Sequence, residues 1–103
     1  MGDGASWAMV VGTLCISLRL EGPRSLKEKR AVLSSMIPRL RQKFQASVAE
    51  VADQELWGNA TIGVAVVSGS ASHVQAVLQA VEDEVASHPE LEVVEVVREV
   101  ERR

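Results

Sequence analysis

Residues 9–20 read MVVGTLCISLRL, and this stretch decides the fold. Large aliphatic side chains alternate in it with smaller or more polar ones, which indicates a β-strand with two different faces. The first face carries Leu14, Ile16, Leu18 and Leu20. The second face carries Val11, Thr13, Cys15, Ser17 and Arg19. Because neither face is strongly polar, we expect this strand to lie in the centre of a sheet.

A long amphipathic helix is expected directly after this strand. Gly22 and Pro23 end the strand, and Ser25 with Glu28 three residues later forms a capping-box pattern. The helix is therefore predicted over residues 26–45. Its apolar stripe recurs at helical spacing and consists of Leu26, Leu33, Ile37, Leu40 and Phe44. Pro38 removes one backbone hydrogen bond inside the helix, so we expect a kink in a single helix.

The rest of the chain alternates strand and helix patterns. Strands are expected over residues 46–52, 60–68 and 91–100, with a second helix from about residue 70 to His88 and Pro89. The resulting order of elements is that of an α+β, ferredoxin-like βαββαβ sandwich. Right-handed crossovers then place both helices on one face of a four-stranded antiparallel sheet in the order 4-1-3-2. This order makes the first and third strands central, in agreement with their apolar character.

Length and composition favour one domain of this kind. The chain has 103 residues, of which 47% are hydrophobic and 24% charged, an ordinary globular balance. Residues 1–8 show no periodic pattern, so we expect a disordered leader followed by a single domain over residues 9–103. No apolar stretch approaches the ~18 residues that span a bilayer, and no signal-peptide pattern is present. We therefore expect a cytoplasmic protein with no membrane partner.

Charge is distributed unevenly along the chain. Residues 24–43 contain seven basic residues and only one acidic residue, whereas residues 82–101 contain eight acidic residues and only one basic residue. The candidate nucleic-acid-binding residues on the flanks of the first helix are Lys27, Lys29, Arg30, Arg39, Arg41 and Lys43. Such a helix is suited to lie along a phosphate backbone. The alternative, favoured by the acidic pI of about 5.3, is a solvated helix face whose cations pair with acids elsewhere.

Several kinds of chemistry find little support in the sequence. The central strands carry no aromatic residue, so RNA recognition by base stacking on the sheet is excluded. Arg24 and Asn59 are loose candidates for an acylphosphatase site, but no glycine-rich phosphate loop accompanies them. Cys15 is the only cysteine, so it cannot form an internal disulfide or a cysteine cluster for zinc. We expect neither an enzyme nor a cofactor.

Three further groups of residues are interpreted as structural. Glu50, Asp53 and Glu55 are expected to be a solvated turn and not a metal site. The two histidines, at positions 73 and 88, fall at the start and the end of the second helix, where capping is the simpler role. Trp57 is expected to cover one end of the core, with an exposed contact role as the alternative.

The segment SLKEKR at residues 25–30, with SVAEV at 47–51 and GVAVV at 63–67, resembles the YlxP-like family of small bacterial proteins. The likeness covers nearly all of residues 9–100 and includes the turn at Leu56 and Trp57. It implies a ferredoxin-like fold. The association of that family with genes for translation initiation and ribosome maturation implies a role linked to the ribosome or to RNA. Pro38 departs from the ordinary helix former expected at its position.

The uncovered face of the sheet is a second candidate interface. It is small and rather apolar, and its expected contact residues are Val11, Thr13, Cys15, Ala65 and Val67. The leading hypothesis is a non-enzymatic protein that associates with RNA or a ribosomal particle through the first helix, with no DNA partner. The alternative is a dimeric protein-interaction or small-ligand regulatory module that uses the open sheet face. An acylphosphatase-like hydrolase is the weakest of the three hypotheses.

Overall fold

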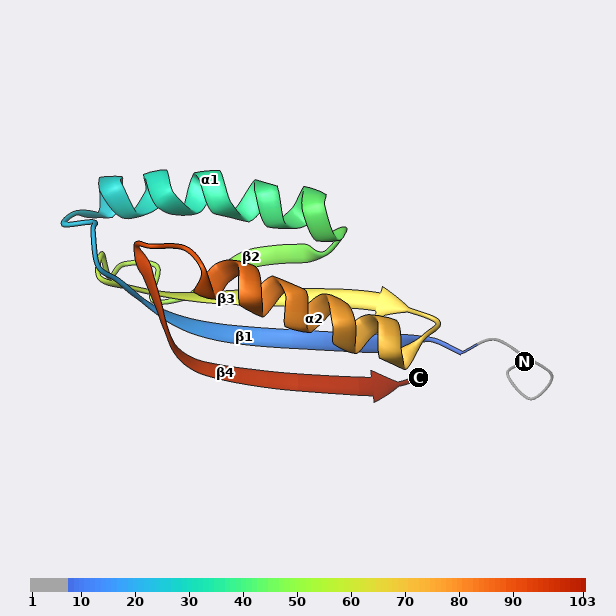
Figure 1. The fold of residues 1–103 in the computed structure, drawn as a ribbon. Coiled ribbons are helices and arrows are strands. Elements are labelled where there is room, and N and C mark those ends of the chain that lie inside the picture. Colours follow the sequence, from blue (N-terminus) through green and yellow to red (C-terminus); the bar gives the residue numbers. More distant parts are fainter. Residues whose placement is uncertain (1–7) are drawn as a thin grey trace.

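The computed structural model describes residues 8–103. Figure 1 shows a four-stranded antiparallel sheet with two helices on one side. The elements are β1 (Val10–Leu20), α1 (Leu26–Phe44), β2 (Ser47–Ala52), β3 (Asn59–Ser68), α2 (Ala71–Ala86) and β4 (Leu91–Arg102). The strand order β2-β3-β1-β4 is the predicted order read from the other edge, so the predicted fold is confirmed. The leader expected over residues 1–8 lies, apart from Ala8, outside the described residues.

The central strands β1 and β3 pair along ten residues, from Val10 opposite Ser68 to Arg19 opposite Asn59. On its other side β1 pairs with β4, with one register shift between Ser17 and Leu18. The strand β2 is shorter and pairs only with β3. Both edges of the sheet are therefore formed by the strands that were expected there. Within residues 8–103, no helix is long and apolar enough to cross a membrane.

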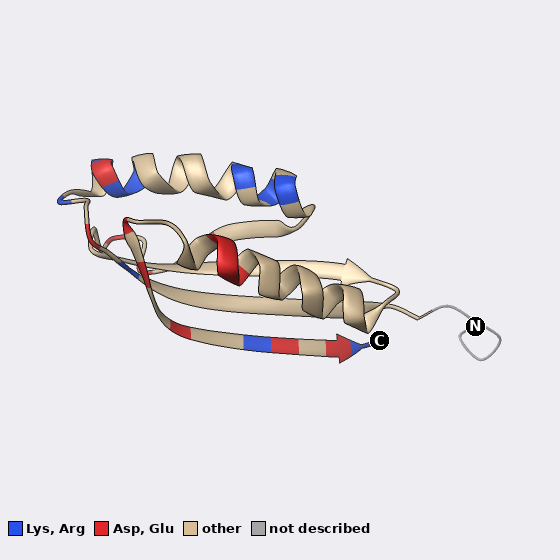
Figure 2. Ribbon diagram, viewed as in Figure 1, with Lys and Arg blue, Asp and Glu red and all other residues tan. Residues whose placement is uncertain are grey.

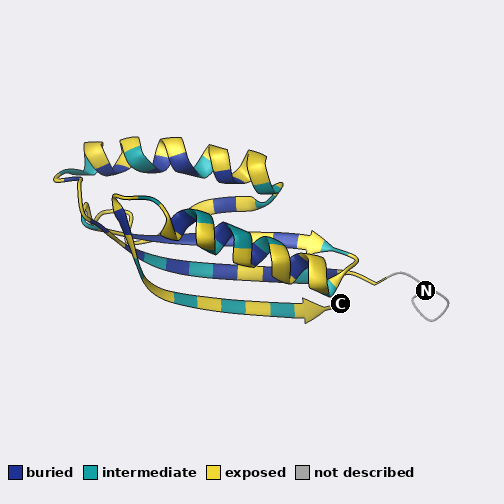
Figure 3. Cartoon of the chain, in the orientation of Figure 1, coloured by how far each residue is buried: buried dark blue, intermediate teal, exposed yellow. Residues whose placement is uncertain are grey.

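The core lies between the sheet and the two helices (Figure 3). The side chains of Leu14, Ile16 and Leu18 on β1 are at most 1% exposed, and Ile62 and Val64 of β3 are buried beside them. The residues between them along each strand point to the opposite face. This alternation confirms the two faces predicted for β1 and leaves one face of the sheet without a helix.

The helix α2 packs closely on the sheet. Ser70 caps its first turn, since its hydroxyl accepts a hydrogen bond from the backbone N–H of His73 at 3.2 Å. Its buried stripe is Val74, Leu78, Val81 and Val85, and Val77 beside it is half-buried. A Cβ atom at Gly12 would lie 2.9 Å from the Cδ1 atom of Leu78. The glycine therefore permits the close approach of α2 to β1.

The helix α1 begins at the predicted cap and continues through Pro38. The Ser25 hydroxyl accepts from the N–H of Glu28 at 3.1 Å, and the Glu28 carboxylate accepts from the N–H of Arg24 at 2.8 Å. The prediction of one helix and not two is confirmed (Figure 1). The predicted stripe is partly wrong, because the buried residues of this helix are Lys29, Leu33, Met36 and Leu40. At 3.6 residues per turn, the buried face is rotated by roughly 40° from the predicted one.

Candidate nucleic-acid interface

The cationic side chains of α1 form two separate groups. Figure 2 shows blue segments at both ends of the helix and an uncharged stretch between them. We name the residues near its start, Arg24, Lys27 and Arg30, the N-terminal basic cluster. We name the residues near its end, Arg39, Arg41 and Lys43, the C-terminal basic cluster. All six of these residues are exposed.

The N-terminal basic cluster is available to a ligand. Ser25 begins the helix at a point that leaves Lys27 and Arg30 on solvent-facing positions of the first two turns. Neither side chain forms an ion pair with a described residue. Glu28, in the same turn, is occupied by the backbone of Arg24. Two cations at the start of α1 are thus free of competing carboxylates within hydrogen-bonding distance.

The C-terminal basic cluster is partly engaged by the protein itself. The Arg41 Nε atom donates a hydrogen bond to the carbonyl oxygen of Val48 at 2.9 Å, which ties α1 to the edge strand β2. The Lys43 Nζ atom lies 2.8 Å from the Glu84 Oε1 atom of α2, although the Lys43 side chain remains 55% exposed. Arg39 forms no ion pair with the described part of the chain. The cations of the C-terminal basic cluster would therefore contact a ligand while they also hold α1 in place.

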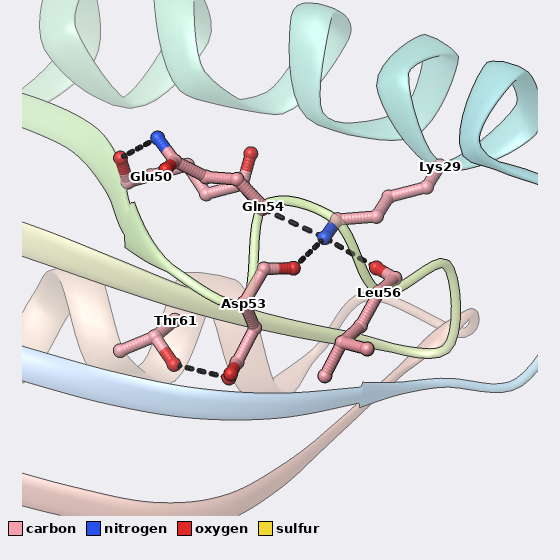
Figure 4. Close-up of polar contacts among 6 residues, drawn as sticks. All are labelled: Lys29, Glu50, Asp53, Gln54, Leu56 and Thr61. Carbon is pink, nitrogen blue, oxygen red and sulfur yellow. Dashed lines mark hydrogen bonds and ion pairs between the residues drawn. The ribbon is translucent and has the colours of Figure 1, made fainter.

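Lys29 does not belong to this interface, and the prediction that placed it there is wrong. Its side chain is 1% exposed and reaches beneath α1 to the loop between β2 and β3 (Figure 4). Its Nζ atom donates to the carbonyl oxygens of Asp53 at 2.7 Å and Leu56 at 2.6 Å. It also lies 2.7 Å from the Glu50 Oε2 atom. Lys29 is a structural anchor, because a buried ammonium satisfied by three oxygens cannot also contact a phosphate.

Glu50, the acidic partner of Lys29, is less well satisfied by hydrogen bonds than the lysine. The Glu50 Oε2 atom is buried and has no hydrogen-bond partner among the described residues, although the Lys29 ammonium is within ion-pair distance. The contact is therefore electrostatic and not a well-aligned hydrogen bond. Asp53 is also engaged, since its carboxylate accepts from the Thr61 hydroxyl at 2.8 Å. These contacts account for Glu50 and Asp53 of this turn.

A small, uncharged stretch separates the two basic clusters. Its exposed residues are Ala31, Ser34, Ser35 and Pro38. The clusters are centred about 14 residues apart, which corresponds to ~21 Å along a helix. With short side chains between its charged ends, α1 can approach a surface closely along its length. Two contact points at this separation would engage phosphates that are not adjacent on one strand.

Acidic residues lie on the other elements. Glu82, Asp83 and Glu84 are on α2, while β4 carries exposed glutamates at positions 92, 95, 99 and 101 (Figure 2). Arg98 of β4 is held by Glu82 at 3.0 Å. A polyanion is therefore repelled from α2 and β4, which leaves the outer face of α1 as the cationic surface of the described structure.

Trp57 is an exposed aromatic residue on the loop between β2 and β3, which Lys29 of α1 contacts. The loop that carries it is joined to the end of β1 by a hydrogen bond from the Leu20 N–H to the Gly58 carbonyl, at 3.0 Å. Trp57 is 49% exposed and Leu56 is 50% exposed. Trp57 therefore leaves about half of its side chain exposed, and it covers the end of the core only in part.

The uncovered face of the sheet is hollow at its centre. The floor is formed by Cys15 and Gly63 of the two central strands, and exposed valines at positions 51 and 97 stand on either side. A Cβ atom on Gly63 would lie 2.9 Å from the Val51 Cγ1 atom, so the glycine makes room for this valine. Of the predicted interface residues, Thr13, Cys15 and Ala65 line this hollow, whereas Val11 and Val67 pair with each other further along the same face, opposite the helices.

The element order, the sheet and the single helix-covered face define a small ferredoxin-like α+β domain. The sequence matches the model of a family described as "Protein of unknown function (DUF503)" over residues 11–98, and the chain belongs to this family. It is 41% identical over 68 residues to "Uncharacterized protein YlxP" of Bacillus subtilis (strain 168), covering 66% of this chain and 74% of that protein. The resemblance noted from the sequence is thereby confirmed.

A solved structure supports the fold alone. The de novo designed protein Foldit4 aligns with a TM-score of 0.53 at 14% sequence identity, covering 92% of this chain and 96% of the designed one. At this identity the likeness carries no information about a ligand.

Proposed function

We propose that this protein binds double-helical segments of RNA through the outer face of α1. The observation that carries the proposal is the pair of exposed basic clusters at the two ends of this helix, with a small uncharged stretch between them. Double-stranded RNA is recognised mainly by shape, phosphates and 2′-hydroxyl groups across a shallow minor groove. A helix with short side chains at its middle and cations at both ends suits such a surface.

The other surfaces of the molecule support this choice of RNA form. Single strands are usually bound by aromatic residues on which the bases stack. Among the described residues, α1 itself carries no exposed aromatic side chain, since Phe44 is half-buried and its ring centroid lies 5.5 Å from the Lys43 ammonium. The exposed Trp57 belongs to the loop between β2 and β3, and a single aromatic residue there does not form a row on which successive bases stack. The acidic residues of α2 and β4 restrict the approach of a polyanion to one side. An overall charge of −3 is compatible with binding because the local charge of α1 decides the contact.

The test is a titration of a short RNA duplex and of one of its strands with the full-length protein. If about four phosphates are contacted, affinity for the duplex should fall by about 100-fold between about 50 and about 200 mM salt. The variant with Arg30→Glu and Arg39→Glu should bind the duplex at least tenfold more weakly. A matched variant with Arg102→Glu and Arg103→Glu changes the net charge equally, on exposed residues at the end of β4.

The two variants separate local contact from overall charge. Equal losses in both would show that only net charge matters and would reject α1 as the site. Tighter binding of the single strand, or an affinity that does not change with salt, would reject double-helical RNA as the ligand.

A further inference from the structure

The open face of the sheet carries a pattern that is complementary to itself. Strand pairing aligns its residues in rows that cross the sheet from β4 to β2. One row consists of Glu99, Thr13, Ala65 and Ser47. The next row consists of Val97, Cys15, Gly63 and Ala49. In both rows the larger side chains lie on the β4 side and the smaller ones on the β2 side.

We propose that two copies of this protein pack through this face, with the two-fold axis parallel to the strands and between β1 and β3. That rotation reverses the order of the strands, so β4 of one copy lies over β2 of the other and β1 lies over β3. Each row then meets the same row of the partner in the opposite direction. Val97 faces the partner's Ala49, and Cys15 faces the partner's Gly63, next to the exposed Val51 side chain that adjoins this glycine. Large side chains thus oppose small ones at the sheet separation of ~10 Å.

The charges on this face favour a two-fold axis parallel to the strands over one that runs across them. The exposed glutamates of the face, at positions 92, 95, 99 and 101, all belong to β4, whereas the facing residues of β2 are uncharged. Glu92 is paired with Arg19 of β1 at 2.8 Å, so the unpaired glutamates nearest the centre of the face are those at positions 95 and 99. With the axis parallel to the strands, the two sets of glutamates are separated by three strand spacings, ~14 Å, in addition to the sheet separation. With the axis across the strands, β4 would lie over β4, and the glutamates would repel each other within a Debye length of ~8–10 Å.

The uncharged edge also offers a partner to one of the glutamates. In the proposed arrangement the exposed Glu99 side chain lies opposite the partner's Ser47, which is also exposed. A serine hydroxyl can donate a hydrogen bond to a carboxylate. The rim of the interface is therefore polar, and its centre consists of small apolar side chains, as is usual for association between folded proteins.

The size of the face indicates a reversible dimer. The ladder of ten residue pairs between β1 and β3 is ~34 Å long, and four strands span ~14 Å between their axes. Each copy can therefore contribute roughly 500 Å², or roughly 1,000 Å² in total, which is at the lower limit for a specific interface. No described residue covers this face, and Val51, Val67 and Val97 are 54%, 63% and 52% exposed on it. We expect dissociation constants in the micromolar range.

The association is measured by sedimentation equilibrium of the full chain, without RNA, over a wide range of concentration. Wild-type protein should show a monomer–dimer equilibrium, and Ala65→Asp should abolish it. The matched control Ala31→Asp places the same charge on the exposed face of α1 and should leave the equilibrium unchanged. A wild-type chain that is monomeric at every concentration would overturn the proposal.

The orientation is tested by a matched pair of substitutions at Ser47, an exposed position of the edge strand β2 that should tolerate both. Ser47→Lys places an ammonium opposite the partner's Glu99 twice in each dimer, and should tighten association by about three- to tenfold. Ser47→Glu should weaken it by a similar factor. Equal effects of the two substitutions would overturn this axis, even if a dimer forms. Because RNA is absent, neither result depends on the function proposed for α1.

Discussion

The helices α1 and α2 cover the same face of the sheet but are attached to it differently. The closest backbone contacts of α2 are with β1, β3 and β4, over valine side chains and Gly12. The helix α1 has its closest backbone contacts with β2 and α2, and it reaches the core through the longer side chains of Leu33, Met36 and Lys29. A helix that is held to the rest of the protein by long side chains can therefore keep its outer face free for charged residues.

The largest loss in the free energy of unfolding is expected at Lys29, the residue that anchors α1. Lys29→Ala removes the cation that lies 2.7 Å from Glu50 and leaves two loop carbonyls without their donor. Removal of one partner from a buried pair costs about 3–5 kcal/mol. We expect a loss of this size in the free energy of unfolding, measured with urea. Lys27→Ala, on an exposed position of the same turn, should change it by less than about 0.5 kcal/mol.

A double substitution separates the charge of this anchor from its packing. Lys29→Met together with Glu50→Gln removes both charges and keeps side chains of similar length. Because replacing a buried ion pair with matched neutral residues is often close to neutral, the double variant should recover part of the loss seen in Lys29→Ala. If Lys29→Ala behaved like Lys27→Ala, the distinction between an anchoring and a surface lysine would be wrong.

The next effect concerns the close packing of α2. Gly12→Ala introduces a Cβ atom that contacts both Val74 and Leu78, and the helix must move away from β1 to accept it. Overpacking of this kind costs about 1–3 kcal/mol. Thermal unfolding should show a lower Tm than that of Gly58→Ala, where nothing lies within 4 Å of the added atom. Equal Tm values would mean that α2 is not packed as tightly as its contacts indicate.

A gain in stability is expected at Pro38 in α1. This residue cannot donate a hydrogen bond to the Ser34 carbonyl, and proline inside a helix is ~3 kcal/mol less favourable than alanine. Proline also restricts the unfolded chain, which offsets part of that difference. Pro38→Ala should therefore raise the free energy of unfolding by about 1–2 kcal/mol in urea titrations. A decrease would show that the proline ring makes a stabilising contact on the helix surface.

The fold was predictable because each element carried its own signal. The alternation in residues 9–20, the Ser25 cap and the order of the strand and helix patterns were enough to predict the order of the strands and the covered face. The cost of burying polar side chains also separates the two faces of β1, since the residues on the second face remain partly or fully exposed. These are local patterns, and the structure reproduces them to within two residues at the ends of most elements.

The role of Lys29 could not be predicted from such local patterns. Its side chain projects on the buried face one turn before Leu33, and this periodicity was the available signal. A rule that assigns lysine to the surface overrides that signal, because a lysine is rarely buried unless it is paired. The pairing depends on Glu50 and on two carbonyl groups of a loop more than 20 residues away, and only the folded chain brings them together.

The smallest effect is expected at the caps of the two helices. Ser70→Ala removes the acceptor for the His73 N–H, and loss of such a cap costs about 1 kcal/mol. Ser25→Ala should cost less, because Glu28 remains in the first turn of α1, where its charge interacts favourably with the helix dipole. Ser70→Thr retains the hydroxyl and should restore most of the lost stability. If Ser25→Ala were the more costly of the two, the start of α1 would depend on its cap more than on its charged first turn and the Lys29 anchor.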